Sequence, residues 1–328
     1  MVTLERMWTE SFRPRTLDDV VGQIEIVKRL KELVRRIDFP HMLFSGPPGV
    51  GKTTCAEAIV NEIYPPSERS SNVKRLNASD DRGINVVRQD IKNFARILPS
   101  GSSSFKIIIL DEADQMTSDA QHALRQTMER YNEITRFILI CNYSSKIISP
   151  IQSRCAIFRF TGLGIDDIKS RLQYIAEKKQ LQVDEKALDA LYESSEGDLR
   201  QTINALQASA SLTPKITVEV VYQVQGYVKP AEVRAAILEC LGKRPNFSTA
   251  RKQIQVLMES YGLSGQDLVK HLNRELGRMT ADEIPESVRF SALSMLSEVD
   301  YRIATGSNPQ VQLDAFLANI ILVAQKLG

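Results

Sequence analysis

A glycine-rich stretch that ends in a lysine and two threonines carries the residue types best suited to chemistry. It reads FSGPPGVGKTT over residues 44–54 and fits the pattern G-x-x-x-x-G-K-[ST], in which backbone N–H groups surround nucleotide phosphates. Glycine lets such a loop turn tightly because it has no Cβ. We expect Lys52 to reach the β- and γ-phosphates and the Thr53 hydroxyl to hold a magnesium ion. The residues expected to bind the nucleotide here are Gly46, Pro47, Pro48, Gly49, Val50, Gly51, Lys52, Thr53 and Thr54.

The flanking residues bear on whether this stretch is a phosphate site or a plain glycine turn. Residues 41–44 read as the end of a buried strand, and residues 53–63 read as a helix. A strand, a glycine loop and a helix are the setting that a phosphate loop requires, and a helix N-terminus attracts anions. This context favours the phosphate site.

Two carboxylates follow a second apolar run. Residues 107–110 are Ile-Ile-Ile-Leu, which is typical of a central strand in a parallel sheet covered on both faces. Asp111 and Glu112 come next, and open α/β sheets place their ligand chemistry at the carboxyl ends of strands. We expect Asp111 to bind the magnesium, directly or through water, and Glu112 to orient and deprotonate the attacking water. The alternative is a pair of solvated acids at a strand end.

Composition limits the classes of protein to consider. A chain of 328 residues is expected to hold two or three domains. The net charge of +2 means that any nucleic-acid surface must be a local patch. The four cysteines are scattered without a C-x-x-C pair, which argues against a zinc site and a disulfide framework and predicts a reducing intracellular compartment. No apolar run reaches membrane-spanning length, so no membrane contact is expected.

The order of elements predicts an α/β fold followed by helices. Alternating strands and helices up to residue 160 imply a doubly wound parallel sheet. The proline pair and serine-rich tract at 65–72 predict an exposed connection, and residues 216–221 fit either a brief strand or a helix start. Strands are expected at 41–44, 73–77, 107–110, 136–141 and 156–160, and helices at 24–37, 53–63, 83–98, 118–132, 166–179, 184–194, 198–209, 218–224, 286–305 and 311–327.

Together these features resemble the AAA+ ATPases and, within them, the small subunits of replication factor C, the sliding-clamp loader of archaea and eukaryotes. The matching pieces occur in family order and cover essentially the whole chain. They are WTESFRPRTLDDVVGQ, GPPGVGKTT, LNASDDRGINVVR, IIILDEAD, ICNYSSKIISPIQSRC and GDLRQTINALQ. NASDDRGI and the triplet Ser153-Arg154-Cys155 are much more specific than the phosphate loop. The resemblance implies an AAA+ nucleotide-binding domain at 1–161, a helical lid at 162–227 and an all-helical, oligomerising collar at 228–328.

The resemblance also implies roles for single residues. Asn142 resembles sensor 1, a polar group that responds to the γ-phosphate or the water, although Asn also forms turns at strand ends. Arg200 resembles sensor 2 of the lid, and Arg154 resembles an arginine finger that acts on the ATP of a neighbouring subunit. Without the family, both arginines would be read as solvated. Arg13, Val20 and Val21 occupy the positions that line the adenine and ribose pocket. Phe12 stands where the family commonly has tyrosine, so a hydroxyl is lost while aromatic packing can persist.

Basic residues in and before the expected helix at 83–98 form the DNA candidate. Cations spaced by four residues can follow a phosphate backbone without reading bases. The alternative is a solvated amphipathic helix. The residues expected to bind DNA are Arg82, Arg88 and Lys92.

The function that the resemblance implies is ATP-dependent clamp loading. ATP with Mg²⁺ would drive opening of a ring-shaped clamp and its placement on primer-template DNA, and hydrolysis would release the loader. The implied partners are a large subunit and further small subunits in a pentamer, the clamp, and DNA without sequence specificity. We favour an archaeal origin, hence the cytoplasm or nucleoid, over a eukaryotic nuclear one. The alternatives are another AAA+ DNA motor, such as a branch-migration helicase subunit, and a scaffold with a degenerate site, which the intact Lys52, Asp111 and Glu112 oppose.

Overall fold

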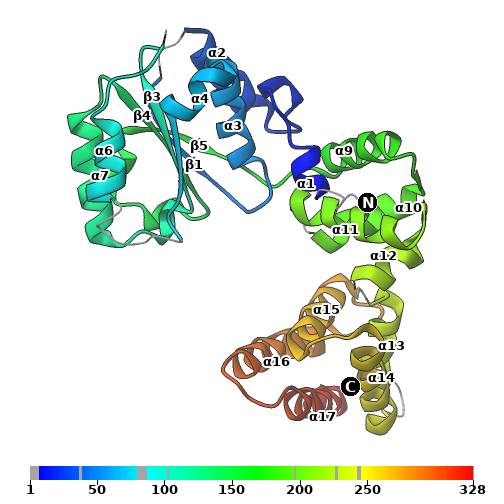
Figure 1. Cartoon of the computed structure of the whole chain (residues 1–328). Coiled ribbons are helices and arrows are strands. Elements are labelled where there is room, and N and C mark those ends of the chain that lie inside the picture. Colours follow the sequence, from blue (N-terminus) through cyan, green and yellow to red (C-terminus); the bar gives the residue numbers. More distant parts are fainter. Residues whose placement is uncertain are drawn as a thin grey trace. The chain divides into compact units, whose positions relative to one another are not determined.

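The computed structural model of the chain, shown in Figure 1, describes residues 7–36, 39–79, 87–101, 103–195, 197–225, 228–241 and 245–327. The chain forms two compact units, residues 1–217 and 218–328. Within the described ranges, no helix combines the length and the apolar character needed to cross a membrane.

A parallel sheet forms the centre of the first unit, as predicted. Within the described residues it has the strand order β2-β3-β4-β1-β5, and all neighbouring strands pair in parallel. The carboxyl ends of parallel strands meet at one edge of the sheet. Because β4 lies between β3 and β1, the ends of these three strands are neighbours. The strands are β1 (His41–Ser45), β2 (Val73–Asn77), β3 (Lys106–Asp111), β4 (Thr135–Cys141) and β5 (Cys155–Arg159).

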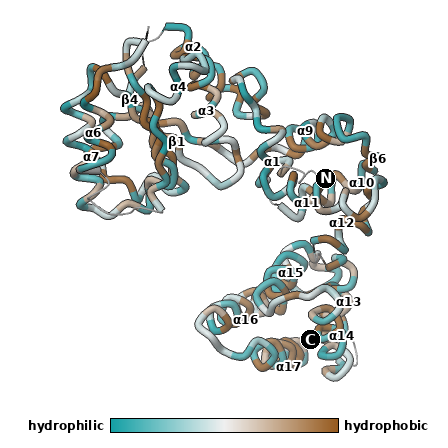
Figure 2. Tube along the Cα trace, viewed as in Figure 1, coloured by the Kyte–Doolittle hydropathy of each residue, from teal (hydrophilic) through white to brown (hydrophobic). Residues whose placement is uncertain are grey.

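Helices cover both faces of this sheet, which explains why the middle residues of its central strands are apolar (Figures 1 and 2). Ile107 and Ile109 of β3 pack into a core with helices α2 and α3. Ile108 and Leu110 point to the other face and pack into a core with α6 and α7. This alternation follows from the two-residue period of a strand. The helices are α2 (Ile24–Arg36), α3 (Lys52–Ile63), α6 (Lys92–Ala95) and α7 (Ser118–Arg130).

The serine-rich tract predicted to be an exposed connection is instead a helix, α4 (Pro66–Asn72). Pro66 suits the start of a helix, where its missing N–H is not needed. At the other end the Asn72 side chain is buried and exchanges two hydrogen bonds of 2.8 Å with the backbone of Ser100. Most of the tract is exposed, as predicted, but its irregular form was predicted wrongly, because this tertiary contact outweighs the turn preference of the tract.

The helix predicted at 83–98 differs in form and in length. Residues 83–86 lie outside the described part, Val87–Ile91 form a π-helical turn, and α6 ends at Ala95. The last carbonyl groups find donors from neighbouring strands: the Lys106 ammonium binds the Phe94 oxygen at 3.1 Å, and the Thr135 hydroxyl binds the Ala95 oxygen at 3.1 Å. Because these partners satisfy the free carbonyl groups at the helix end, the helix stops earlier than the apolar pattern indicates.

A helical segment completes the first unit. The backbone N–H of Trp8 donates to the Gln207 side chain at 2.8 Å, which ties the N-terminal helix to α11. Residues 216–221 divide between both predicted forms, because Ile216 ends strand β7 and Val218 begins α12. The elements are α1 (Trp8–Ser11), α9 (Ile165–Lys178), α10 (Glu185–Ser195), α11 (Leu199–Leu212) and the parallel pair β6 (Gln182–Val183) and β7 (Lys215–Ile216).

The second unit is helical over its described residues and has its own core of aliphatic side chains. The predicted lid ends at residue 227, whereas the division into compact units falls between residues 217 and 218 and places α12 in the second unit. The lid boundary at residue 227 stays a prediction. The helices are α12 (Val218–Gln225), α13 (Pro230–Leu241), α14 (Phe247–Tyr261), α15 (Gly265–Arg278), α16 (Glu286–Ala304) and α17 (Pro309–Leu327).

Truncation of Ile59 tests the packing of α3 on the sheet. Ile59 is fully buried, so Ile59→Ala should lower the free energy of unfolding by roughly 2–5 kcal/mol. Ile24 is 76% exposed, so Ile24→Ala should change it by no more than about 0.5 kcal/mol. Denaturant titration followed by the fluorescence of Trp8, which lies in the same unit, measures both. Equal effects of the two substitutions would contradict the assigned core.

Candidate nucleotide site

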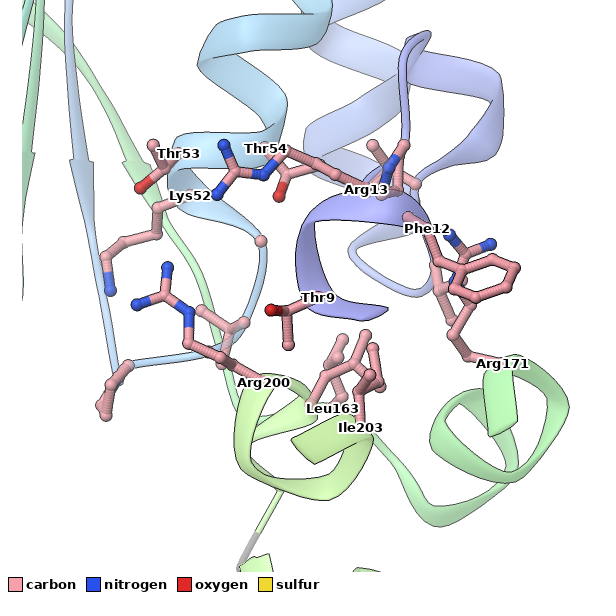
Figure 3. Close-up of a pocket in the computed structure, with 18 of the residues that line it drawn as sticks. Thr9, Phe12, Arg13, Lys52, Thr53, Thr54, Leu163, Arg171, Arg200 and Ile203 are labelled. Atoms are coloured by element: carbon pink, nitrogen blue, oxygen red, sulfur yellow. Dashed lines mark hydrogen bonds between the residues drawn. The ribbon is translucent and has the colours of Figure 1, made fainter. Parts of the chain in front are cut away.

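A pocket at the carboxyl edge of the sheet brings together residues from several parts of the first unit. The phosphate loop and the ends of β3 and β4 supply one group of lining residues, and the N-terminal segment, α9 and α11 supply most of the others. Figure 3 shows Lys52, Thr53 and Arg200 pointing into the same space. The lining residues are Thr9, Glu10, Phe12, Arg13, Pro14, Val20, Val21, Pro48, Gly49, Val50, Gly51, Lys52, Thr53, Thr54, Asp111, Glu112, Asn142, Leu163, Arg171, Leu199, Arg200 and Ile203.

Lys52 occupies the centre of the polar side. Its ammonium donates to the carbonyl oxygens of Gly46 and Pro47 at 2.6 and 2.5 Å and to Oδ1 of Asn142 at 3.1 Å. Burial lowers the pKa of Lys52, and the nearby Asp111 opposes that shift. A charged group with reduced hydration gains strongly from an added anion. The ammonium is therefore suited to bind a phosphate group.

Thr53 and Asp111 form the predicted metal pair. The Thr53 hydroxyl donates to Oδ2 of Asp111 at 2.9 Å, so one hydroxyl and one carboxylate converge at the start of α3. In the part of the chain that the structure describes, no group of three or more His, Cys, Asp or Glu side chains could hold a metal ion. Oxygen ligands in this small number fit Mg²⁺, which takes its remaining ligands from phosphates and water.

Glu112 has a backbone conformation that costs energy. Its φ of 52° lies in the left-handed region, which non-glycine residues adopt at a cost of about 1–3 kcal/mol. Its N–H donates to Oδ1 of Asp111 at 2.9 Å, so the same carboxylate that meets Thr53 also holds this turn. The strained turn brings Glu112 to the pocket instead of continuing the strand.

Asn142 follows β4 and places its side-chain oxygen on Lys52. The next residue, Tyr143, donates its N–H to Oδ2 of the buried Asp114 at 3.3 Å. Asp114 stands three residues after Asp111, so the ends of β3 and β4 are joined by side chains as well as by the sheet. This link limits the movement of Asn142 relative to the acid pair.

Arg200 reaches the pocket from the first turn of α11. Asp198 caps this helix, because its carboxylate accepts a hydrogen bond of 3.0 Å from the N–H of Gln201. The cap also lies against the phosphate loop: a Cβ added to Gly49 would stand 1.8 Å from Oδ1 of Asp198. Loop and helix are therefore in close contact, and the start of α11 cannot move without affecting the loop.

Phe12 lines the pocket beside residues that the sequence did not single out. It packs edge-on against Trp8 and Tyr174, with ring centroids 6.4 Å apart in each pair. The carbonyl oxygen of Phe12 accepts a hydrogen bond from the Arg171 guanidinium. Burial lowers the pKa of Arg171. The aromatic residue in place of tyrosine was a signal for Phe12, and the retained packing agrees with that expectation. The lining residues that the sequence did not single out are Thr9, Glu10, Pro14, Leu163, Arg171, Leu199 and Ile203.

Other predicted residues lie outside the pocket lining. Gly46 and Pro47 take part through their carbonyl groups, as described for Lys52. Arg154 is not among the lining residues and instead contacts Glu129 and Pro150 of its own chain.

The predicted DNA-binding residues are only partly described. Arg82 lies outside the described residues, Arg88 belongs by its backbone to the π-helical turn, and Lys92 is exposed at the start of α6.

Family models match three parts of the chain. The model of the ATPase family associated with various cellular activities (AAA) matches residues 42–163, an RFC1-like AAA+ ATPase lid domain matches 165–219, and a replication factor C C-terminal domain matches 228–319.

Curated relatives match nearly end to end. The replication factor C small subunit of Aeropyrum pernix is 50% identical over 324 residues, covering 99% of this chain and 98% of the relative. That of Thermofilum pendens is 49% identical, with 98% of each chain covered. Among solved structures, the Thermotoga maritima RuvB Holliday junction branch migration motor aligns with a TM-score of 0.53 at 19% identity, covering 83% of this chain and 87% of that one. At this identity the likeness concerns the fold alone.

A side chain at Gly49 tests the contact between loop and helix. Gly49 has a φ of +69° and no room for a Cβ, so Gly49→Ala should force the loop away from Asp198 and spread its N–H groups. We expect the Kd for ATP to rise at least about tenfold, which corresponds to roughly 1.4 kcal/mol. Gly162→Ala is the control, because a Cβ there meets nothing within 4 Å. Titration with a fluorescent ATP analogue measures both, and unchanged affinity of Gly49→Ala would contradict the assigned contact.

Proposed function

Because the chain belongs to the replication factor C small-subunit family, we propose that it is an ATP-hydrolysing subunit of a clamp loader. The observation that carries the proposal is the single pocket that joins Lys52, the Thr53–Asp111 pair, Glu112 and Asn142 at one edge of the sheet. Together these residues supply the kinds of group that phosphoryl transfer to water needs: a cation for the phosphates, oxygen ligands for a metal, a carboxylate for the water and a polar sensor.

ATP binding would replace the present partners of Lys52. Its ammonium is held by two loop carbonyl groups and Asn142, and phosphate oxygens carry more negative charge than these neutral acceptors. The Lys52 ammonium would therefore bind the phosphates in place of these acceptors. The phosphates would also raise the pKa of Lys52, which burial lowers. Asn142 would at the same moment lose its hydrogen bond to Lys52. This exchange gives a physical reason why Asn142 responds to bound nucleotide.

Hydrolysis would then depend on Glu112. Magnesium held by Thr53 and Asp111 would neutralise charge on the phosphates. The strained turn places Glu112 beside that pair, where its carboxylate would orient a water molecule and accept its proton. Asn142 would hold the same water or the γ-phosphate. Arg200 would close the site from α11, with the close approach of Asp198 to Gly49 carrying the movement to the loop.

Arg13, Val20 and Val21 would receive the nucleoside. All three line the pocket. Arg13 is held there by an ion pair of 2.7 Å with Glu10, and Phe12 supplies an aromatic neighbour without a hydroxyl group.

Arg154 would act on the site of the next subunit. Its absence from the lining of the pocket in its own chain supports a role in trans. A guanidinium that arrives from a neighbour makes hydrolysis depend on the arrangement of subunits. We propose the three-part division 1–161, 162–227 and 228–328 for this assembly, with the collar holding a pentamer together. An archaeal cytoplasm or nucleoid is the expected location.

DNA and clamp surfaces are assigned on charge and exposure. Lys92 is exposed and, with Arg82 and Arg88, would follow the backbone of primer-template DNA without reading bases. Ile97 and Leu98 follow α6 and are 57% and 71% exposed. Adjacent apolar residues this exposed suit a partner surface, and we propose that they contact the sliding clamp. The alternative of a branch-migration motor has only a likeness of fold in its favour.

Removal of the Lys52 ammonium tests the site. Lys52→Ala should abolish ATP-dependent loading of the clamp onto primed DNA by an assembly built with this variant, because the phosphates lose their central cation. ATPase activity should be measured with and without clamp and primed DNA, and for the chain alone and with its large subunit. Lys92→Ala is the control, because it removes a lysine from the DNA surface and should leave DNA-independent hydrolysis intact. Normal loading by the Lys52 variant would refute the site.

Removal of the Arg154 guanidinium separates binding from hydrolysis. Arg154→Ala should leave the Kd for ATP within about twofold of wild type, while hydrolysis in the assembly falls by roughly 10³–10⁵, the range measured for arginine fingers. Equilibrium binding and single-turnover hydrolysis measure the two quantities. Wild-type turnover by the assembled variant would show that Arg154 has no role in trans.

A further inference from the structure

A carboxylate holds Arg154 on the surface of its own subunit. One guanidinium nitrogen, Nη1, donates to the Pro150 carbonyl oxygen at 2.6 Å, and Nη2 forms an ion pair with Glu129. Glu129 lies in the last turn of α7, whose buried face packs into the core beneath the sheet. The carboxylate is thus attached to a rigid element, unlike the long side chain that it holds.

The carboxylate of Glu129 is itself held from the same helix. Arg125 lies one turn earlier, and its Nη1 stands 3.6 Å from the Oε1 atom that Arg154 contacts. The side chains of Arg125, Glu129 and Arg154 are 33%, 39% and 37% exposed, so another chain can reach them. Two guanidinium groups sharing one carboxylate leave a net positive charge, which suits an approaching polyphosphate.

We propose that Glu129 is a positioning residue for Arg154, and this inference rests on the proposed role of Arg154 in trans. An arginine side chain loses considerable rotamer freedom when it is fixed. The ion pair with Glu129 restricts the Arg154 side chain before subunits meet, so this entropy is lost in advance. The contacts with Pro150 and Glu129 use only part of the five N–H donors of a guanidinium, so donors remain for phosphate oxygens. A donor fixed in advance needs no reorganisation during the reaction.

An ordinary surface ion pair is the competing explanation. Such pairs contribute little to folding stability, so a purely structural Glu129 would be almost silent in every assay. A positioning Glu129 would be silent in folding and in nucleotide binding but visible in the rate of hydrolysis. The two explanations therefore differ in one measurable quantity, the kcat of the assembled loader.

The experiment uses the loader assembled from this chain and its large subunit, with clamp and primed DNA. Glu129→Ala should lower kcat for ATP hydrolysis by roughly 5–30-fold, the effect of leaving one arginine side chain unordered. The KM for ATP should stay within about twofold, since Glu129 does not line the pocket of its own chain. Glu129→Gln keeps the side-chain oxygen and the volume, so it should lose less and should assemble as wild type does. Glu133→Ala, which removes an exposed carboxylate from the turn after α7, is the charge-matched control.

A double substitution shows whether Glu129 works through Arg154. In an Arg154→Ala background, Glu129→Ala should cause no further loss of kcat, because the group that it positions is gone. A further loss of kcat in the double variant would overturn the inference. So would an unchanged or a raised kcat in both single variants, Glu129→Ala and Glu129→Gln. If Arg154→Ala itself hydrolysed ATP normally, the proposed function in trans would fail. If Arg154→Ala were impaired while both Glu129 variants were normal, only the positioning role would fail.

Discussion

Parallel pairing of β3, β4 and β1 is the constraint on which the site depends. It sets the carboxyl ends of three neighbouring strands at one edge of the sheet, and each end supplies a different group. The phosphate loop follows β1, the acid pair follows β3, and Asn142 follows β4. The hydrogen bond of 2.9 Å between Thr53 and Asp111 is a direct consequence, because it joins the first helix after β1 to the end of a strand two places away in the sheet.

Charge balance at Lys52 connects this edge to nucleotide binding. The ammonium is buried, and its partners are two neutral carbonyl groups and one amide oxygen. Burial lowers its pKa, so the ammonium has already lost much of its hydration in the folded protein, before any phosphate binds. The same ammonium also donates a hydrogen bond to the Asn142 side chain. In the proposed function, ATP binding and the response of Asn142 would therefore both follow from one change of partners at Lys52.

Much of the first unit was predictable because its signals are local. The apolar run at 107–110 predicts a doubly covered strand, and the glycines of the phosphate loop predict a tight turn. The tract at 65–72 misled because its turn residues were overruled by the contacts of Asn72 with Ser100, which no local pattern reveals. The helix at 83–98 was predicted too long for a similar reason, since α6 ends on contacts with Lys106 of β3 and Thr135 of β4, which the local apolar pattern does not include.

The sequence by itself determined which residues are candidates for the chemistry, because Lys52, Thr53, Asp111 and Glu112 are recognised by type, spacing and position after apolar runs. It also singled out Arg154, through the triplet in which it stands. Only the tertiary structure decided who their partners are. Thr53 meets Asp111, Asp198 lies against Gly49, and Glu129 holds Arg154. Each of these pairs joins residues whose separation along the chain carries no signal, since the contact arises from packing of whole elements and not from any local preference.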